Sequence, residues 1–363
     1  MRKNIIFFLP NFSEGGAGNS ILRLCEFLKK KFNINIIIIS LGENSFKKYF
    51  FKLNIKVIEI KKKKLIFAIN DLKEIINPYI YKDEKLIFVS NINYSNLICS
   101  IFLKRFISKK FKLVLIERTP IEELDFGKSL IQKFKNKLIK FLIKHYYRNA
   151  SYIIANSSHV AKSLQRHVRC KVQTINPITE FKKFKKKYNV KKKILWIGRN
   201  SFEKNINDLF DLVKATVNQN YEISIITNFD KNKNKNYNLL NKHYKKIKFI
   251  KYSNKKLDKI YLKSDIVIST SLYEGFPNVV AEGINHECLI VSSKNIGGIY
   301  DLVKNQDYGV FYEINNISQL SIKLKDIIDN FSAYKKKIKK SKQNLLKLSL
   351  NSKRDYFNLF KKI

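Results

Sequence analysis

Short apolar runs rich in β-branched residues alternate with helical patterns along this chain, and the alternation starts again halfway. In the first half such runs stand at Ile5–Leu9, Ile34–Ile39, Lys56–Ile60, Lys85–Val89, Lys112–Ile116 and Tyr152–Ala155. Because the runs are almost continuously apolar, we expect strands that are covered on both faces, as in a parallel sheet flanked by helices. The first half therefore predicts one doubly wound α/β domain.

The same pattern resumes after Asn176-Pro177 and a Lys-rich segment, Lys183–Lys193, that suits a hinge. The second set of runs stands at Ile194–Ile197, Glu222–Thr227, Ile247–Tyr252, Asp265–Ser269, Leu289–Ser292 and Gly309–Tyr312. From Ile317 onward the chain reads as helix. We therefore expect two doubly wound, Rossmann-like domains, residues 1–177 and 178–345, whose parallel sheets face a central ligand cleft.

Composition narrows the class of protein. Apolar residues make up 45% of the 363 residues, enough for two buried cores, and the formal net charge is +43. The four cysteines stand far apart, which argues against a zinc site or a disulfide framework. The charge reflects either a Lys-rich composition or attraction to an anionic surface. Since no nucleic-acid-binding module is recognisable, we favour a membrane surface over nucleic acid as the anionic partner.

The loop after the first predicted strand, Asn11–Ser20, is rich in glycine. Gly15 and Gly16 let the backbone approach a ligand, and the helix that follows offers unpaired N–H groups to an anion. The spacing is neither a Walker motif nor GxGxxG. A tight strand-to-helix turn explains the same glycines, so this loop alone does not decide between the two interpretations.

The loop after Ile194–Ile197 carries two cations behind Gly198. Arg199 and Lys204 combine a guanidinium fork with a point charge, and together they can neutralise a diphosphate. A loop lysine means little in a chain this rich in lysine. Arg199 means more, because the chain has only nine arginines.

The segment Thr270–Gly283 is the most specific signal in the chain. It turns at Gly275, and Pro277 is expected to begin a helix at a position where its missing N–H is harmless. Glu274 on the loop and Glu282 in the second turn of the helix are placed to accept hydrogen bonds from vicinal hydroxyls of a sugar or a ribose. Capping or surface solvation explains either carboxylate alone but not the whole string.

The string EGFPNVVAEG closely resembles the retaining glycosyltransferases of family 4, which have the GT-B fold. Glu274 and Glu282, separated by seven residues, match that family's E-x7-E motif. The resemblance spans most of the chain, and its other matches are IGRNSFEKN before the string, Gly297-Gly298 after it, the Gly15-Gly16 loop, Asn156-Ser157 and Asn176-Pro177.

The resemblance implies a role for each matching residue. Arg199 and Lys204 would hold the donor's diphosphate and stabilise the leaving nucleotide, which is where fixed cations lower the barrier. Glu282 would bind the nucleotide ribose, and Glu274 would lie beside the transferred sugar. The remaining donor contacts would come from Gly15, Gly16, Gly198, Gly275, Phe276, Pro277, Asn278 and Val279. Family members generally work without a metal, so the resemblance implies no metal and no cofactor, the nucleotide sugar being a substrate.

The chain departs from the family pattern after the fifth predicted strand. Many members have a His there, whereas this chain has Glu117 and Arg118, as does a subgroup resembling bacterial surface-polysaccharide and lipid-linked-oligosaccharide transferases. Together with Asn91, these residues are candidate acceptor contacts. In Gln132–Tyr147, lysines interleave with Phe, Leu and Ile, a pattern typical of an interfacial helix near anionic lipid and equally of a core helix.

These observations predict a retaining glycosyltransferase of the hexosyl type. It would move a sugar from a nucleotide donor, UDP being favoured by the resemblance, to a glycan or lipid-linked glycan in cell-surface polysaccharide or lipopolysaccharide biosynthesis. It would act in the cytoplasm, a lipid-linked acceptor placing it at the inner face of the plasma membrane, and the helix at about residues 346–363 is expected to pack back on the first domain. The alternatives are a sugar-nucleotide epimerase of the same fold and a non-catalytic basic membrane-binding protein.

Overall fold

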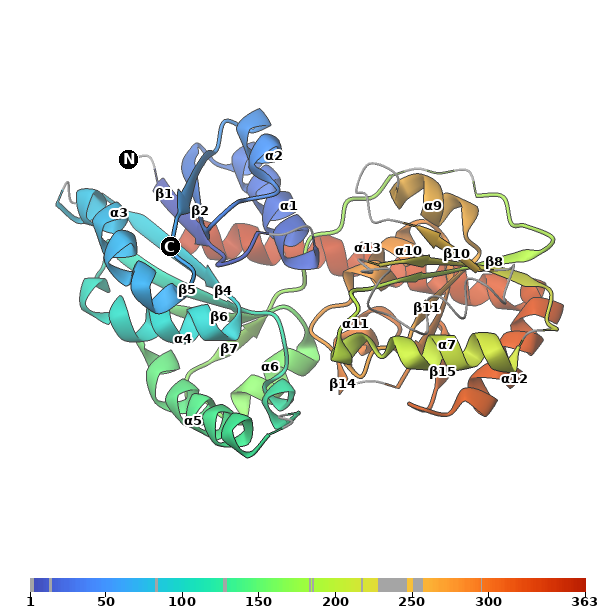
Figure 1. Cartoon of the computed structure of the whole chain (residues 1–363). Helices are drawn as coiled ribbons and strands as arrows, with labels where there is room; N and C mark the ends of the chain where they lie inside the picture. Colours follow the sequence, from blue (N-terminus) through green and yellow to red (C-terminus); the bar gives the residue numbers. More distant parts are fainter. Residues whose placement is uncertain are drawn as a thin grey trace. The chain divides into compact units, whose positions relative to one another are not determined.

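The computed structural model describes residues 3–12, 15–81, 84–126, 129–182, 184, 186–216, 218–227, 247–250, 257–294 and 296–363. The chain divides into two compact units (Figure 1). Unit 1 comprises Met1–Ile178 and Ser349–Ile363, and unit 2 comprises Thr179–Leu348. Each unit contains a parallel sheet with helices on both faces, so the predicted α/β fold class is confirmed.

The sheet of unit 1 has seven parallel strands in the order β3-β2-β1-β4-β5-β6-β7. They are β1 Lys3–Phe8, β2 Ile34–Leu41, β3 Lys56–Ile60, β4 Leu86–Asn91, β5 Phe111–Glu117, β6 Tyr152–Ala155 and β7 Val172–Thr174. The helices of this unit are α1 Gly16–Lys31, α2 Lys47–Lys52, α3 Ile69–Tyr81, α4 Asn93–Phe102, α5 Leu130–Tyr146 and α6 Ser158–Gln165. Strand β7 was not predicted, because its three half-buried residues form no apolar run.

Both faces of this sheet are buried, which explains the unbroken apolar runs. In β1, Ile6 and Phe8 belong to the core under α3, α4 and α5, whereas Ile5 and Phe7 belong to the core under α1 and α2. Figure 1 shows these two groups of helices on opposite sides of the sheet. The second core is completed by the end of the long helix α13, Phe331–Lys362.

The main sheet of unit 2 has six parallel strands in the order β10-β9-β8-β11-β13-β15. They are β8 Lys192–Ile197, β9 Tyr221–Ile226, β10 Ile247–Ile250, β11 Ile266–Ser269, β13 Leu289–Ser293 and β15 Val310–Tyr312. A separate pair is formed by β12 Tyr273–Glu274 and β14 Ile296–Gly297. The helices are α7 Ile206–Ala215, α9 Leu257–Lys263, α10 Asn278–Asn285, α11 Ile299–Leu302, α12 Ile317–Asp329 and the first part of α13.

Helices α7 and α12 cover one face of this sheet and α9 and α10 the other (Figure 1). Some predicted features fall outside the described residues, namely the end of the strand Ile247–Tyr252, part of the hinge Lys183–Lys193, and Ser13 and Glu14 of the first loop. None of the helices described in the structure combines the length and the apolar character that a membrane span needs.

The strand order reverses at one place in each sheet. In unit 1 the reversal lies between β1 and β4, and in unit 2 between β8 and β11. Loops that leave neighbouring strands at such a point diverge and leave room for a ligand beyond the carboxyl ends of the strands. In unit 2 these are the loops that carry the Arg199 and Glu274 motifs.

Candidate functional site

Two loops of unit 2 are joined beyond the ends of β8 and β11. The Thr270 hydroxyl donates a hydrogen bond to the carbonyl oxygen of Lys204 at 2.7 Å and accepts one from Nε1 of buried Trp196 at 3.0 Å. The Leu272 N–H donates to the Glu203 carbonyl oxygen at 2.8 Å. The two motif loops therefore form one structural feature, although about 70 residues separate them in sequence.

Lys204 and Glu274 form an ion pair at this junction. Their side chains keep only 19% and 14% of their exposure, and the Ser271 hydroxyl donates a hydrogen bond of 2.8 Å to the same Glu274 oxygen. The two charges thus compensate each other, and the Glu274 carboxylate also accepts a hydrogen bond from a hydroxyl, as partly buried charges require. The structure brings together two residues that the sequence motifs had singled out separately.

Arg199 lies apart from this pair. Its side chain is 77% exposed, and its Nη2 atom contacts Oε1 of Glu203 at 2.9 Å. The Ser201 hydroxyl donates to the same oxygen at 2.6 Å. Burial raises the pKa of Glu203, but the hydrogen bond from Ser201 and the charges of Arg199 and Lys204 outweigh it and hold that pKa below its usual value. Each predicted phosphate-binding cation therefore has a carboxylate partner, and sequence reasoning missed Glu203.

The backbone of Glu274 is fixed by the short pair of strands β12 and β14. The Gly298 N–H donates to the Glu274 carbonyl oxygen at 3.1 Å. Gly297 has a φ of +152°, and a Cβ atom there would lie 1.8 Å from that same carbonyl oxygen. Only glycine fits such a close approach. The Gly297-Gly298 pair therefore holds the Glu274 loop in place.

Helix α10 carries Glu282 in its second turn. Pro277 is the N-cap of this helix rather than its first residue, so the predicted start was early by one position. Oε2 of Glu282 accepts a hydrogen bond of 3.2 Å from the Tyr261 hydroxyl of α9, which is also 3.3 Å from the Val279 carbonyl oxygen. The sequence analysis did not identify Tyr261, because it does not belong to any of the recognised motifs.

The other predicted donor residues of unit 2 lie on the same loops. Gly198 directly follows β8, and a Cβ atom there would come within 2.7 Å of the Trp196 ring. Gly275 and Phe276 are buried between β12 and α10, with Phe276 in the core. Asn278 is the first residue of α10. In the first turn of this helix, the Val280 N–H donates to the carbonyl oxygen of the N-cap Pro277 at 3.0 Å, and the N–H groups of Asn278 and Val279 precede the first intrahelical hydrogen bond.

In unit 1, Gly15 and Gly16 lie at the start of α1, the helix that follows β1. Gly15 precedes the helix in an extended conformation, and Gly16 is the first helical residue. The Ser20 hydroxyl donates to the Gly16 carbonyl oxygen at 2.7 Å. The two glycines are thus at the strand-order reversal of their own sheet.

Asn91 and Arg118 form a polar bridge at the ends of β1, β4 and β5. The Asn91 side chain is fully buried; its Nδ2 donates to the Phe8 carbonyl oxygen at 3.2 Å, and its Oδ1 accepts from Nε and Nη2 of Arg118 at 3.2 and 2.8 Å. Ile92, the next residue, has a φ of +76°, which β-branched side chains rarely adopt. Strained backbone of this kind concentrates at ligand sites.

Glu117 points away from this bridge and into the core. Its side chain is only 3% exposed, and Oε1 accepts hydrogen bonds from Asn96 Nδ2 at 2.6 Å and from the Tyr147 hydroxyl. Burial raises the pKa of Glu117 to about 7, although the hydrogen bonds from Tyr147 and Asn96 lower it. In this structure its carboxylate does not reach solvent, which is a correction to its expected role as an acceptor contact. Because neighbouring residues of a strand point to opposite faces of the sheet, the side chains of Glu117 and Arg118 point in different directions.

The chemistry that unit 2 offers follows from these groups. Arg199, Lys204 and the N-terminus of α10 supply positive charge for an anion, and Glu274 and Glu282 supply acceptors for hydroxyl groups. Among the residues that the structure describes, no group of three or more His, Cys, Asp or Glu side chains is arranged to hold a metal ion.

The fold of the whole chain is shared with solved glycosyltransferase structures. Sucrose-phosphate synthase from Thermosynechococcus elongatus aligns with a TM-score of 0.80 at 14% identity, over all of both chains. TarM aligns with a TM-score of 0.77 at 12% identity, over 99% of both chains. HepE from Anabaena, solved in complex with UDP-glucose, aligns with a TM-score of 0.77 at 15% identity, over 99% of this chain and all of HepE. These likenesses establish the GT-B fold.

Sequence comparison concerns mainly the second half of the chain. CapH, a capsular polysaccharide biosynthesis glycosyltransferase of Staphylococcus aureus, is 29% identical over 178 residues, which are 45% of this chain and 47% of CapH. AmsD, an amylovoran biosynthesis glycosyltransferase of Erwinia amylovora, is 25% identical over 125 residues, which are 34% of this chain and 36% of AmsD. The matched segments span less than half the length of either relative. Residues 177–344 match the family model for glycosyl transferases group 1, so this segment is similar to a group 1 glycosyltransferase domain.

Proposed function

We propose that the chain is a retaining glycosyltransferase of family 4. It moves a sugar from a UDP-linked donor to a glycan or lipid-linked glycan in the biosynthesis of surface polysaccharide or lipopolysaccharide. The observation that carries the proposal is the Lys204–Glu274 junction at the strand-order reversal of unit 2, within the matched residues 177–344. The polysaccharide roles in the names of CapH and AmsD and the UDP-glucose complex of HepE support the acceptor and donor classes.

The reaction breaks the bond between the anomeric carbon of the sugar and the diphosphate. Negative charge grows on the leaving phosphate, and Lys204, Arg199 and the start of α10 are the groups of unit 2 that stabilise it. Lys204 is paired with Glu274 before the donor binds. We propose that Lys204 Nζ turns to the diphosphate, and that Glu274, still hydrogen-bonded by Ser271, accepts a hydroxyl of the transferred sugar.

Retention then requires no protein nucleophile. The acceptor hydroxyl attacks the same face that the phosphate leaves, its proton passes to the departing phosphate oxygen, and the new glycosidic bond forms as the old one breaks. The scheme assigns charge neutralisation to Lys204 and Arg199 and uses neither a metal ion nor a cofactor. Glu282 is assigned to the ribose of the nucleotide, whose vicinal hydroxyls suit a carboxylate.

The acceptor is assigned to unit 1. Arg118 and Asn91 form a polar bridge beyond the carboxyl ends of its strands, where ligands of doubly wound sheets bind. Gly15 and Gly16 lie at the start of α1, the helix that follows the neighbouring strand β1, and are assigned to the donor diphosphate. The proposed setting is the cytoplasm, at the inner face of the plasma membrane.

Thermal unfolding with a panel of nucleotides tests the donor site. A ligand that binds only the folded state stabilises it by about 2.7 kcal/mol at one hundred times its Kd. We expect UDP and UDP-sugars, but not GDP or ADP, to raise the melting temperature. The shift should be lost in Arg199→Ala and Glu282→Ala and kept in Arg354→Ala and Glu313→Ala, matched substitutions away from the two loops.

Two results would contradict the proposal. If none of the nucleotides stabilises the protein, or if Arg199→Ala and Glu282→Ala both bind UDP as the wild type does, the donor site is assigned wrongly. Retention is tested separately by NMR of the product, since an α-linked donor must give an α-glycoside. A β-glycoside would exclude the same-face mechanism.

A further inference from the structure

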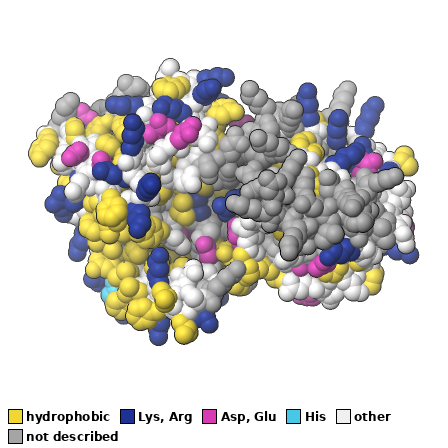
Figure 2. Space-filling view, in the orientation of Figure 1, with side chains coloured by type: hydrophobic (Ala, Val, Ile, Leu, Met, Phe, Trp, Pro, Cys, Tyr) yellow, Lys and Arg dark blue, Asp and Glu magenta, His cyan; other side chains and the backbone are white. Residues whose placement is uncertain are grey.

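Helix α5 of unit 1 exposes a row of large apolar side chains. Leu130 and Ile131 are each 83% exposed, and Phe134 is 74% exposed. One and two turns further on, Leu138 and Phe141 are 49% and 56% exposed. The spacing places all five on one side of the helix, and they are called the α5 face below. Figure 2 shows hydrophobic side chains gathered over this part of unit 1, at the lower left of the view.

The α5 face is distinct from the side of α5 that holds the helix in the protein. Ile143 is buried in the core, and Ile139, Leu142 and Tyr146 pack against the same core. Asn136 is anchored as well, since its Nδ2 donates to the Leu124 carbonyl oxygen at 2.8 Å. The helix is therefore fixed by one apolar side while a second apolar side remains in solvent. Contiguous exposed apolar surface of this kind marks an interaction site.

Positive charge accompanies the α5 face. Lys133, Lys135, Lys137 and Lys144 are exposed on the same helix, and none of its seventeen residues is acidic. Lys140, the remaining lysine, pairs with Asp125 at 2.6 Å. Apolar side chains bordered by lysines are complementary to a lipid surface whose headgroups are anionic.

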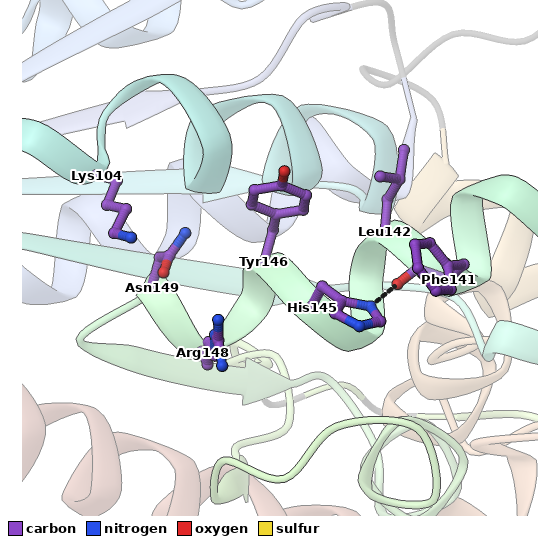
Figure 3. Close-up of a pocket in the computed structure, with 7 residues that line it drawn as sticks. All are labelled: Lys104, Phe141, Leu142, His145, Tyr146, Arg148 and Asn149. Atoms are coloured by element: carbon purple, nitrogen blue, oxygen red, sulfur yellow. Dashed lines mark hydrogen bonds between the residues drawn. The ribbon is translucent and has the colours of Figure 1, made fainter.

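A pocket of about 360 Å³ lies at the end of the same helix. Its lining residues, all described in the structure, are Lys104, Phe141, Leu142, His145, Tyr146, Arg148 and Asn149, and none of them is acidic. Figure 3 shows Lys104, Arg148 and Asn149 toward one end of the pocket and Phe141 and Leu142 toward the other. Phe141 thus belongs both to the pocket and to the α5 face.

We propose that the α5 face docks on an anionic phospholipid bilayer, and that the pocket binds a lipid phosphate between Lys104 and Arg148. Phe134, Leu138 and Phe141 enter the boundary between headgroups and acyl chains, while the lysines of α5 contact neighbouring headgroups. The inference deepens the proposed function, because an acceptor carried on a lipid would then be presented to unit 1. The docking itself is independent of the donor chemistry in unit 2.

Vesicle flotation without any nucleotide tests the docking. Full-length protein is mixed with vesicles of phosphatidylcholine alone or with about 30% phosphatidylglycerol, at 0.15 M and at 0.5 M NaCl. The first variant, Ile131→Ser/Leu138→Ser, removes two members of the α5 face, and its matched control, Ile322→Ser/Leu350→Ser, makes the same exchanges at exposed positions of unit 2 and α13. The wild type and the control should float with the anionic vesicles, and the α5 variant should bind them at least tenfold more weakly.

The pocket has its own pair of variants. Lys104→Gln/Arg148→Gln should bind anionic vesicles several-fold more weakly than Lys63→Gln/Arg169→Gln, which removes the same charge from exposed positions outside the pocket. High salt screens the general attraction of a chain with a charge of +43, so the α5 contribution should dominate at 0.5 M NaCl.

Three outcomes would overturn the proposal. Equal binding by the α5 variant and its control would mean that charge alone drives association, and no binding of the wild type would exclude the bilayer. A change of sedimentation from dimer to monomer in the α5 variant, with no change in vesicle binding, would assign the face to a second copy of the chain. Because vesicle binding is measured without donor, its failure is distinguishable from a failure of UDP binding.

Discussion

Replacing Glu117 by glutamine should make the stability of unit 1 less dependent on pH. Burial raises the pKa of Glu117 from 4.5 to about 7. A carboxyl whose pKa is higher in the folded state binds more protons there than in the unfolded chain, so its ionisation lowers stability as pH rises. This change in pKa corresponds to a destabilisation of about 3 kcal/mol by the ionised carboxylate. The destabilisation is absent below pH 4.5 and complete above pH 7.

Glu117→Gln mimics the protonated carboxyl. It keeps the acceptor at Oε1, to which both Asn96 and Tyr147 donate, and it cannot ionise. Between pH 5 and pH 8, the stability of the variant relative to that of the wild type should therefore increase by about 2.5 kcal/mol. For a unit of this size, the melting temperature of the variant relative to that of the wild type should increase by roughly 5–10 °C over the same pH range.

The assay is thermal unfolding of the wild type and the variant from pH 5 to pH 8. Glu59→Gln is the control of opposite sign, because the hydrogen bond from Lys47 lowers the pKa of Glu59. Ionised Glu59 stabilises the fold, and this stabilisation is lost only as pH falls below 4.5. Between pH 5 and pH 8, Glu59→Gln should therefore be less stable than the wild type by an amount that does not change with pH. Parallel curves for Glu117→Gln and the wild type would refute the raised pKa.

Three further predictions concern the site and the core. Gly297→Ala should lower UDP-sugar turnover at least tenfold, because its Cβ would lie 1.8 Å from the Glu274 carbonyl oxygen; unchanged kinetics would show that the loop adapts. Lys204→Met should cost about 1–3 kcal/mol in denaturant unfolding by leaving Glu274 without its ion pair, and Lys204→Met/Glu274→Gln should recover part of that loss. Leu359 is 5% exposed, so Leu359→Ala should lower the free energy of unfolding by about 2–5 kcal/mol. Leu350 on the same helix is 57% exposed, so Leu350→Ala should lower it by less than about 0.5 kcal/mol. Equal losses would contradict the assignment of Leu359 to the core of unit 1.

Much of the fold was readable because strands buried on both faces leave long apolar runs. The predicted strands at Lys56–Ile60 and Tyr152–Ala155 agree with β3 and β6 at every residue. Strands without such a run were not predicted. Strand β7 is only half-buried, and β12 and β14 have two residues each, which is too few to show any periodicity.

The sequence predicted the loops of the candidate site separately, but it did not predict which side chains of different loops contact each other. That Lys204 contacts Glu274 depends on β8 lying beside β11, which is a matter of strand order and not of local pattern. The inward direction of Glu117 was equally hidden, because it depends on which face of β5 the residue occupies. For α5, the pattern of lysines and apolar residues left interfacial and core interpretations open. The structure shows a buried side and an exposed apolar side on the same helix.

Helix α13 belongs to both units, and this has a consequence for the order in which they fold during synthesis. Ile338 and Leu345 complete the cores of unit 2, whereas Tyr356, Leu359 and Phe360 complete a core of unit 1. The ribosome makes most of unit 1 first, yet Tyr356, Leu359 and Phe360, which complete its core under α1 and α2, are made only after unit 2. Unit 2 can therefore finish folding before unit 1, whose core under α1 and α2 stays incomplete until the end of α13 has been made. A chaperone that shields this core would have the most effect in that interval.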